Sequence, residues 1–134
     1  MSMRELFDAL GAALQDERWS WGGVREHDKR VFLCVWQDTI REIDGKRCVW
    51  VSDVEGADES LGAGERLKHL GLIRSGYAPY LVTCGTDERA TQPTATKGID
   101  GWKILVGGAL LAREDGFWLE VTNLAPLRDV TARP

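Results

Sequence analysis

The chain has 134 residues, of which 43% are hydrophobic and 28% are charged, and its formal net charge is −4. This length suits one domain with a single core, so we expect residues 1–134 to form one globular domain. No apolar run approaches the roughly 20 residues that a membrane-spanning helix needs. The N-terminal residues 1–6 lack the apolar stretch and cleavage site of a secretory signal. We therefore expect a cytoplasmic protein with no membrane partner.

The acidic balance argues against a protein that coats nucleic acid non-specifically, because that mode depends on many Lys and Arg contacts to phosphate. The charge is nevertheless uneven along the chain. Acidic residues gather in residues 53–59, and basic residues gather in residues 66–74. This asymmetry leaves room for a local basic patch.

Cysteine and histidine are too few and too scattered to indicate a metal site. Cys34, Cys48 and Cys84 each lie in an apolar, strand-like run, which is typical of buried thiols. The two histidines, His27 and His69, do not combine with them in any known zinc-ligand spacing. We therefore expect no metal and no cofactor.

The first predicted element is an amphipathic helix over residues 2–16. Leu6, Phe7, Leu10 and Leu14 recur at helical spacing, and Ser2 and Glu5 have the form of a capping box. The apolar stripe is expected to pack on a sheet; binding a partner is the alternative.

The next segments predict strands. Residues 31–36 form a short apolar run rich in strand formers, which indicates a central strand. Residues 40–52 give two strand-like halves around Asp44-Gly45, a strong hairpin signal.

A second helix is predicted from about Gly62 to Ser75, with Gly76 as its C-terminal cap. Its inward stripe would be Leu67, Leu70 and Ile73, which leaves Arg66, Lys68 and Arg74 for solvent or a ligand. A strand over residues 80–84 follows it.

Residues 85–101 read as a long polar loop, which is often functional or mobile in a compact domain. Residues 103–112 and 117–122 then predict a second hairpin around Asp115-Gly116, with a bulge or a close backbone approach at Gly107-Gly108. Together the elements predict an α+β domain with two helices and a curved, mostly antiparallel sheet or partly open β-barrel.

Three segments carry a family resemblance: Trp36-Gln-Asp38, residues 60–70 and residues 75–84. They resemble an uncharacterised bacterial domain that is sometimes found beside HNH-type endonuclease modules, over residues 19–122. The resemblance implies a nucleic-acid context. The nuclease would be a separate module with its own histidine and asparagine motif, so no nuclease activity is carried over to this chain.

The strongest candidate site is the segment Ser60–His69. A glycine-rich turn with Gly62 and Gly64 would expose backbone N–H groups at a helix N-terminus, which attracts anions. Arg66 would be the best single anion contact, with Lys68 and His69 beside it. The alternative is a tight loop that only feeds the helix, since the chain lacks the phosphate-loop and dinucleotide motifs.

Aromatic residues suggest a second contact. Trp19 and Trp21 would lie on one side of an extended segment, and with Tyr77 and Tyr80 they would form a stacking platform for a base. An aromatic lid over the sheet is the alternative.

These features lead to three functional hypotheses. The first is a non-catalytic module that binds nucleic acid through the glycine turn, the basic helix and the aromatic residues. The second is a small enzyme for a phosphorylated or carboxylated metabolite, in which Glu65 and His69, four residues apart, act as an acid–base pair. The third is an interaction protein that forms a homodimer.

Overall fold

The computed structural model describes residues 3–15, 20–36, 39–53, 60–84 and 103–125. In this part of the chain, two α-helices, a short 3-10 helix and seven strands occur. They are α1 (Met3–Ala9), β1 (Gly22–Arg25), η1 (Glu26–Asp28), β2 (Arg30–Trp36), β3 (Ile40–Ile43), β4 (Lys46–Ser52), α2 (Leu61–Arg74), β5 (Ala78–Cys84), β6 (Lys103–Arg113) and β7 (Gly116–Ala125). The long predicted loop, residues 85–101, lies outside the described residues.

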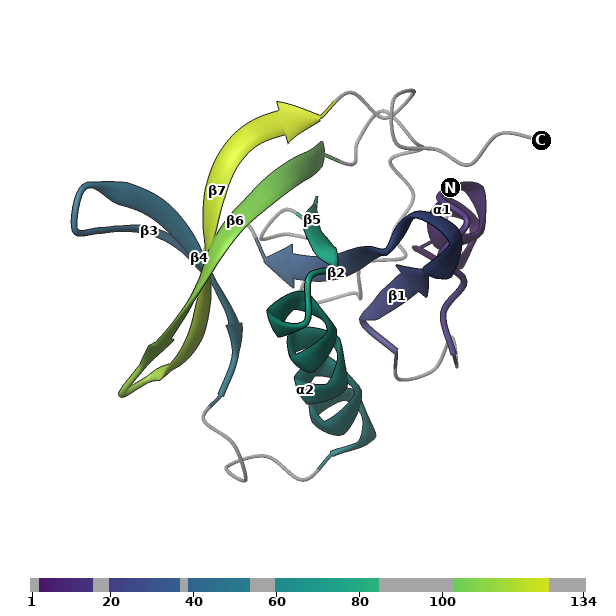
Figure 1. Ribbon diagram of the computed structural model, residues 1–134, viewed down its shortest axis with the longest axis horizontal. Helices are drawn as coiled ribbons and strands as arrows, with labels where there is room; N and C mark the ends of the chain where they lie inside the picture. Colours follow the sequence, from purple (N-terminus) through teal and green to yellow (C-terminus); the bar gives the residue numbers. More distant parts are fainter. Residues whose placement is uncertain (1–2, 16–19, 37–38, 54–59, 85–102, 126–134) are drawn as a thin grey trace.

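The seven strands form one sheet in the order β1-β2-β5-β6-β7-β4-β3. Neighbouring strands are antiparallel except β2 and β5, which are parallel. The chain between these two includes the β3–β4 hairpin and α2, and the hairpin joins the far side of the sheet by pairing with β7. The prediction of an α+β fold with two helices and a mostly antiparallel sheet is confirmed, and the curved sheet stays open (Figure 1).

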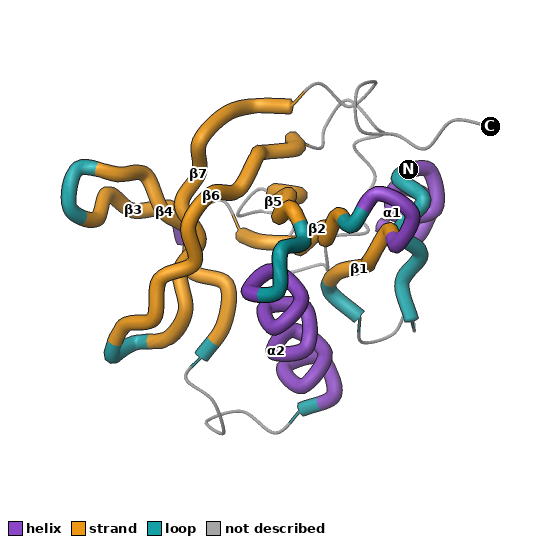
Figure 2. Tube along the Cα trace, viewed as in Figure 1, coloured by secondary structure: helices purple, strands orange, loops and turns teal. Residues whose placement is uncertain are grey.

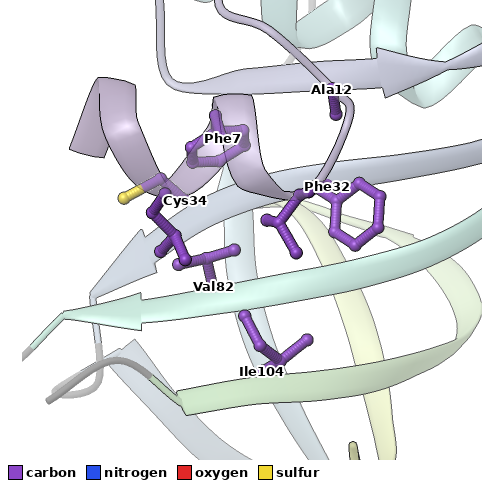
Figure 3. Packing of buried hydrophobic residues seen from close by; sticks show 8 residues of the cluster. Phe7, Ala12, Phe32, Cys34, Val82 and Ile104 are labelled. Carbon is purple, nitrogen blue, oxygen red and sulfur yellow. The ribbon is translucent and has the colours of Figure 1, made fainter. Parts of the chain in front are cut away.

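Both faces of β2, the second strand from one edge of the sheet, are buried, because its side chains alternate between two clusters. Phe32 and Cys34 face one way and pack with Phe7 of α1 (Figure 3). Val31, Leu33 and Val35 face the other way and pack with Leu70 of α2. We call these the α1-side cluster (Leu6, Phe7, Leu10, Ala12, Phe32, Cys34, Val82, Ile104) and the α2-side cluster (Val31, Leu33, Val35, Val49, Val51, Leu70, Leu81, Leu119). The helices therefore cover opposite faces of the sheet, in separate places along it (Figure 2).

Both predicted hairpins are present. Asp44 and Gly45 form the two-residue turn between β3 and β4 with φ angles of 52° and 80°, the signature of a turn that matches strand twist. The register between β6 and β7 shifts on both sides of Gly107, which confirms the predicted bulge. Such bulges bend a sheet, and β6 and β7 form the most curved ribbon of the molecule (Figure 1).

Two predicted elements differ from the structure. The N-terminal helix ends at Ala9 instead of residue 16, because Gly11 adopts a left-handed φ of 73° that ends the helical run. β1 was not predicted, since Gly22 and Gly23 carry no strand signal.

Neither helix of the described chain has the length and apolar character that crossing a membrane requires.

Candidate functional site

The glycines of the predicted anion-binding turn lie inside α2. Ser60 is the N-cap: its hydroxyl oxygen accepts from the Ala63 N–H at 3.2 Å, and its carbonyl accepts from the Gly64 N–H at 3.0 Å. The helix therefore begins at Leu61, and Gly62 and Gly64 belong to its first turn. The prediction of a separate glycine turn before the helix is wrong, because the Ser60 cap outweighs the low helix propensity of the two glycines.

Arg66 faces the interior of the protein and is only 6% exposed. Its Nη1 donates to the Val51 carbonyl at 2.6 Å, and its Nη2 donates to the carbonyls of Cys34 at 2.8 Å and Trp21 at 3.2 Å. Burial lowers its pKa to about 10, so the guanidinium keeps its charge at neutral pH. The prediction that Arg66 is left for solvent or an anion is wrong, because its donors hold backbone carbonyls at the ends of β2 and β4 and just before β1.

Glu65, the neighbour of Arg66, is buried as well and binds the same stretch of backbone. Its carboxylate accepts from the Ser20 hydroxyl at 2.7 Å and from the Trp21 N–H at 3.2 Å. Burial raises the pKa of this carboxyl group, and the Ser20 hydrogen bond opposes that rise. Glu65 and Arg66 together therefore hold both the N–H and the carbonyl of Trp21.

His69 is buried one turn further along α2, and its Nδ1 has no hydrogen-bond partner. The ring lies against the backbone of Gly22, where a methyl group in place of hydrogen would come within 3.1 Å of Nδ1. Burial, together with the smaller effect of the Arg66 charge, lowers the pKa of His69 to about 4, so the imidazole is neutral at pH 7. The hydrogen bonds described for Glu65 go to Ser20 and Trp21 and not to His69, so the predicted acid–base pair is not formed.

The other predicted contacts are dispersed. Lys68 is exposed on α2, and Trp19 lies outside the described residues. The Trp21 backbone is held by residues near the start of α2, whereas Tyr77 follows the end of α2 and donates from its hydroxyl to Glu26 at 2.6 Å. Trp21 and Tyr77 therefore lie at opposite ends of the helix, and Tyr80 stacks on Phe32 at 5.2 Å, on the α1 side of the sheet. The structure does not bring these aromatic side chains together as one platform.

A small cleft lies beside Trp21 at the N-terminal end of α2. It has a volume of about 60 Å³ and is lined by Trp21, Trp50, Val51, Ser52, Asp53, Ser60, Gly62, Ala63, Arg66 and Leu67. A water molecule takes about 30 Å³, so the cleft has room for a small side group and not for a whole ligand. Trp21 is 49% exposed at this cleft, and Leu61, which lies between two lining residues, is 67% exposed.

Trp50 and Asp53 are cleft residues that sequence reasoning missed. Trp50 lies in a strand run, where a large ring is expected in the core, but it is only partly buried and its Nε1 donates to the Asp115 carbonyl at 3.0 Å. Only the pairing of β4 with β7 places it there, and that pairing has no local sequence signal.

Among the described residues, no group of three His, Cys, Asp or Glu side chains is arranged to hold a metal ion. In comparisons with known proteins, no family model, no curated protein and no solved structure matches this chain. The resemblance to the domain that accompanies HNH-type modules therefore stays a prediction.

Proposed function

We propose that this chain is a non-catalytic binding module that anchors a protein partner on Trp21 at the N-terminal end of α2. The observation that carries the proposal is a half-exposed indole on a fixed backbone, since Glu65 and Arg66 hold the N–H and the carbonyl of Trp21. A partly exposed tryptophan on a fixed backbone is typical of an anchor residue in a protein interface.

The surroundings of Trp21 support an apolar contact. Leu61 adds a second exposed apolar side chain, and the 60 Å³ cleft accepts one small group of the partner. Polar groups of Ser52, Asp53 and Ser60 line the same cleft and supply a polar rim.

A protein partner fits this surface better than nucleic acid. The predicted phosphate contact, Arg66, is occupied by three carbonyls. Asp53 lines the cleft, and its carboxylate would repel phosphate there. Nucleic-acid binding stays a prediction that the experiment below also tests.

The enzyme and homodimer hypotheses have fewer observations to support them. An enzyme built on Glu65 and His69 has no hydrogen bond between the two groups to support it. A homodimer through the Trp21 surface is a special case of the proposal, in which the partner is a second copy. A cytoplasmic location is part of the proposal, and the buried free thiol of Cys48 is compatible with it.

Photo-crosslinking from the rim of the cleft tests the proposal. A benzoylphenylalanine introduced at Leu61 should give a discrete protein adduct in cells, whereas the same probe at exposed Arg113, on the β6–β7 turn, should not. The partner, identified by mass spectrometry and purified, should bind at least about tenfold more weakly to Trp21→Ala. That variant should fold normally, since its backbone contacts are kept.

Three other outcomes of the crosslinking experiment would change or refute the proposal. A nucleic-acid adduct at Leu61, with anisotropy binding that weakens as salt rises, would replace the protein partner with nucleic acid. An adduct of twice the chain mass, with a dimer in light scattering, would identify the partner as a second copy. Equal labelling from Leu61 and Arg113 would refute the proposal.

A further inference from the structure

A second hollow lies beside the α2-side cluster, apart from the Trp21 cleft. It has a volume of about 690 Å³, and its described lining residues come from β3 to β7: Ile40, Arg47, Thr83, Leu105, Val121, Thr122, Asn123 and Leu124. We call this the sheet groove. Binding sites for small molecules usually measure about 300–1,000 Å³, so the sheet groove has the size of a ligand site and the Trp21 cleft does not.

The position of the sheet groove follows from how the sheet curves. The bulges between β6 and β7 bend this ribbon, and α2 contacts β1, β2 and β4. Ile40, Leu105 and Val121 pack at the margin of the α2-side cluster. The floor of the groove is therefore the edge of the hydrophobic core, on the face that α2 covers elsewhere.

Half of the described lining residues of the sheet groove are apolar: Ile40, Leu105, Val121 and Leu124. Leu105 and Val121 are only partly buried, and Leu124 is 61% exposed, which makes it one of the large apolar side chains most open to solvent in the described chain. Partly covered leucine and valine side chains gathered around one hollow are typical of a site for an apolar ligand.

The polar groups of the sheet groove favour an anion. Arg47 is the one charged side chain among the described lining residues. The side-chain Oδ1 of Asn123 accepts from the Leu124 backbone N–H at 2.8 Å, and the side-chain Nδ2 is a donor. The nearest carboxylate in the strand register is Glu42, which lies across from Arg47 in the β3–β4 pair and does not line the groove.

We propose that the sheet groove binds an elongated apolar carboxylate, of the kind that a medium-chain fatty acid represents, with its chain on Leu105, Val121 and Leu124 and its carboxylate on Arg47. An arginine fork matches a carboxylate in two parallel hydrogen bonds. Among the described residues, this site and the Trp21 cleft have no lining residue in common.

Calorimetric titration of the full chain tests the site, with dodecanoate as the probe below its critical micelle concentration. Dodecanoate should bind with one molecule per chain, and more tightly than dodecanol or dodecylammonium. Arg47→Gln should lower the affinity for dodecanoate by about tenfold, because one charge-assisted pair is lost. The affinity for dodecanol should not change. Arg113→Gln, which removes the same charge at the far turn of the β6–β7 ribbon, should change neither affinity.

Two further variants test the position of the ligand. Val121→Trp fills the groove and should abolish binding of all three probes. If this variant does not fold, Leu124→Glu serves instead, because it places a carboxylate at an exposed position of the rim. It should lower the affinity for dodecanoate but not the affinity for dodecylammonium.

Equal affinities for dodecanoate and dodecanol, or no effect of Arg47→Gln, would overturn the carboxylate assignment, and failure of all three probes to bind would overturn the site. Trp21→Ala should leave dodecanoate binding intact, so failure here is distinguishable from failure of the protein-binding proposal.

Discussion

Arg66 connects parts of the backbone that the sheet does not connect. Its guanidinium joins Cys34 of β2 to Val51 of β4, although these strands are not neighbours in the sheet, and it also holds Trp21 before β1. A buried guanidinium stabilises the fold only while its N–H donors have hydrogen-bond acceptors. The residue that the sequence marks as the best anion contact is therefore a structural residue.

Replacing Arg66 should damage the fold before it affects any binding. Arg66→Met removes a hydrogen-bond donor from the carbonyls of Val51 and Cys34, while the Trp21 carbonyl still accepts from the Cys34 N–H at 2.8 Å. At about 1–3 kcal/mol for each lost bond, we expect the free energy of unfolding to fall by about 2 kcal/mol or more. Urea denaturation measures this loss. Lys68→Met, on the exposed face of the same helix, should change the free energy of unfolding by less than about 0.5 kcal/mol. Equal effects of the two substitutions would show that Arg66 does not hold the three carbonyls.

His69 should make the protein less stable in acid. Its pKa in the folded protein is lowered to about 4 from the ordinary 6.5 of a histidine, so below pH 6.5 the unfolded chain takes up a proton that the folded chain does not. Stability is therefore lost as the pH falls from about 6.5 to about 4, by about 3 kcal/mol in total. The Glu65 carboxyl, with its raised pKa, acts in the opposite direction.

A substitution isolates the contribution of His69 to this pH dependence. The free energy of unfolding of His69→Leu should fall less between about pH 7 and about pH 4 than that of the unchanged protein, since Glu65 is common to both. His27→Leu, at an exposed histidine, should behave as the unchanged protein does. If His69→Leu loses as much stability in acid as the unchanged protein, His69 is not buried in its neutral form.

At the scale of elements, patterns that arise from neighbouring residues could be predicted and long-range ones could not. The Asp44-Gly45 turn, the Gly107 bulge and the position of α2 to within one residue at each end follow from local turn and capping chemistry. The inner face of α2 was only partly predicted. Leu70 is buried as expected, but Glu65, Arg66 and His69 are buried beside it. Their acceptors and neighbours lie 32 to 45 residues away in Ser20, Trp21 and Cys34, so no local pattern reveals them.

The two outward glycines of α2 offer a direct test of the helix that replaces the predicted turn. A methyl group at Gly64 or Gly71 would meet no atom within 4 Å, and neither residue has a positive φ. Gly64→Ala and Gly71→Ala should each raise the free energy of unfolding by about 0.5–1 kcal/mol, because alanine restricts the unfolded chain and favours the helix. Thermal and urea denaturation measure the gain.

A third glycine is the matched control. At Gly23 a methyl group would lie 1.9 Å from the Ala12 carbonyl oxygen, so Gly23→Ala should destabilise the protein by more than the α2 substitutions stabilise it. If Gly64→Ala instead lowers stability, residue 64 does not lie in a regular helix turn.

At the scale of the whole molecule, the two clusters are layers of one structure, because β2 supplies side chains to both. β5 does the same through Leu81 and Val82, and β6 through Leu105 and Ile104. Loosening either cluster moves strands that the other also needs. We therefore expect the described part of the chain to unfold in one cooperative step, as a single domain does.

Core substitutions on opposite faces of the sheet test whether the two clusters unfold together. Phe7→Ala removes a ring from the α1-side cluster, and Leu70→Ala removes a side chain from the α2-side cluster; both residues are fully buried. Each should lower the free energy of unfolding by about 2–5 kcal/mol and shift the whole transition, with tryptophan fluorescence and far-ultraviolet circular dichroism remaining coincident. Two separate transitions in Phe7→Ala would mean that α1 and the strands beneath it form an independent unit. Because the Trp21 cleft and the sheet groove both lie on the α2 side, binding at either would then be expected to survive the loss of α1 packing.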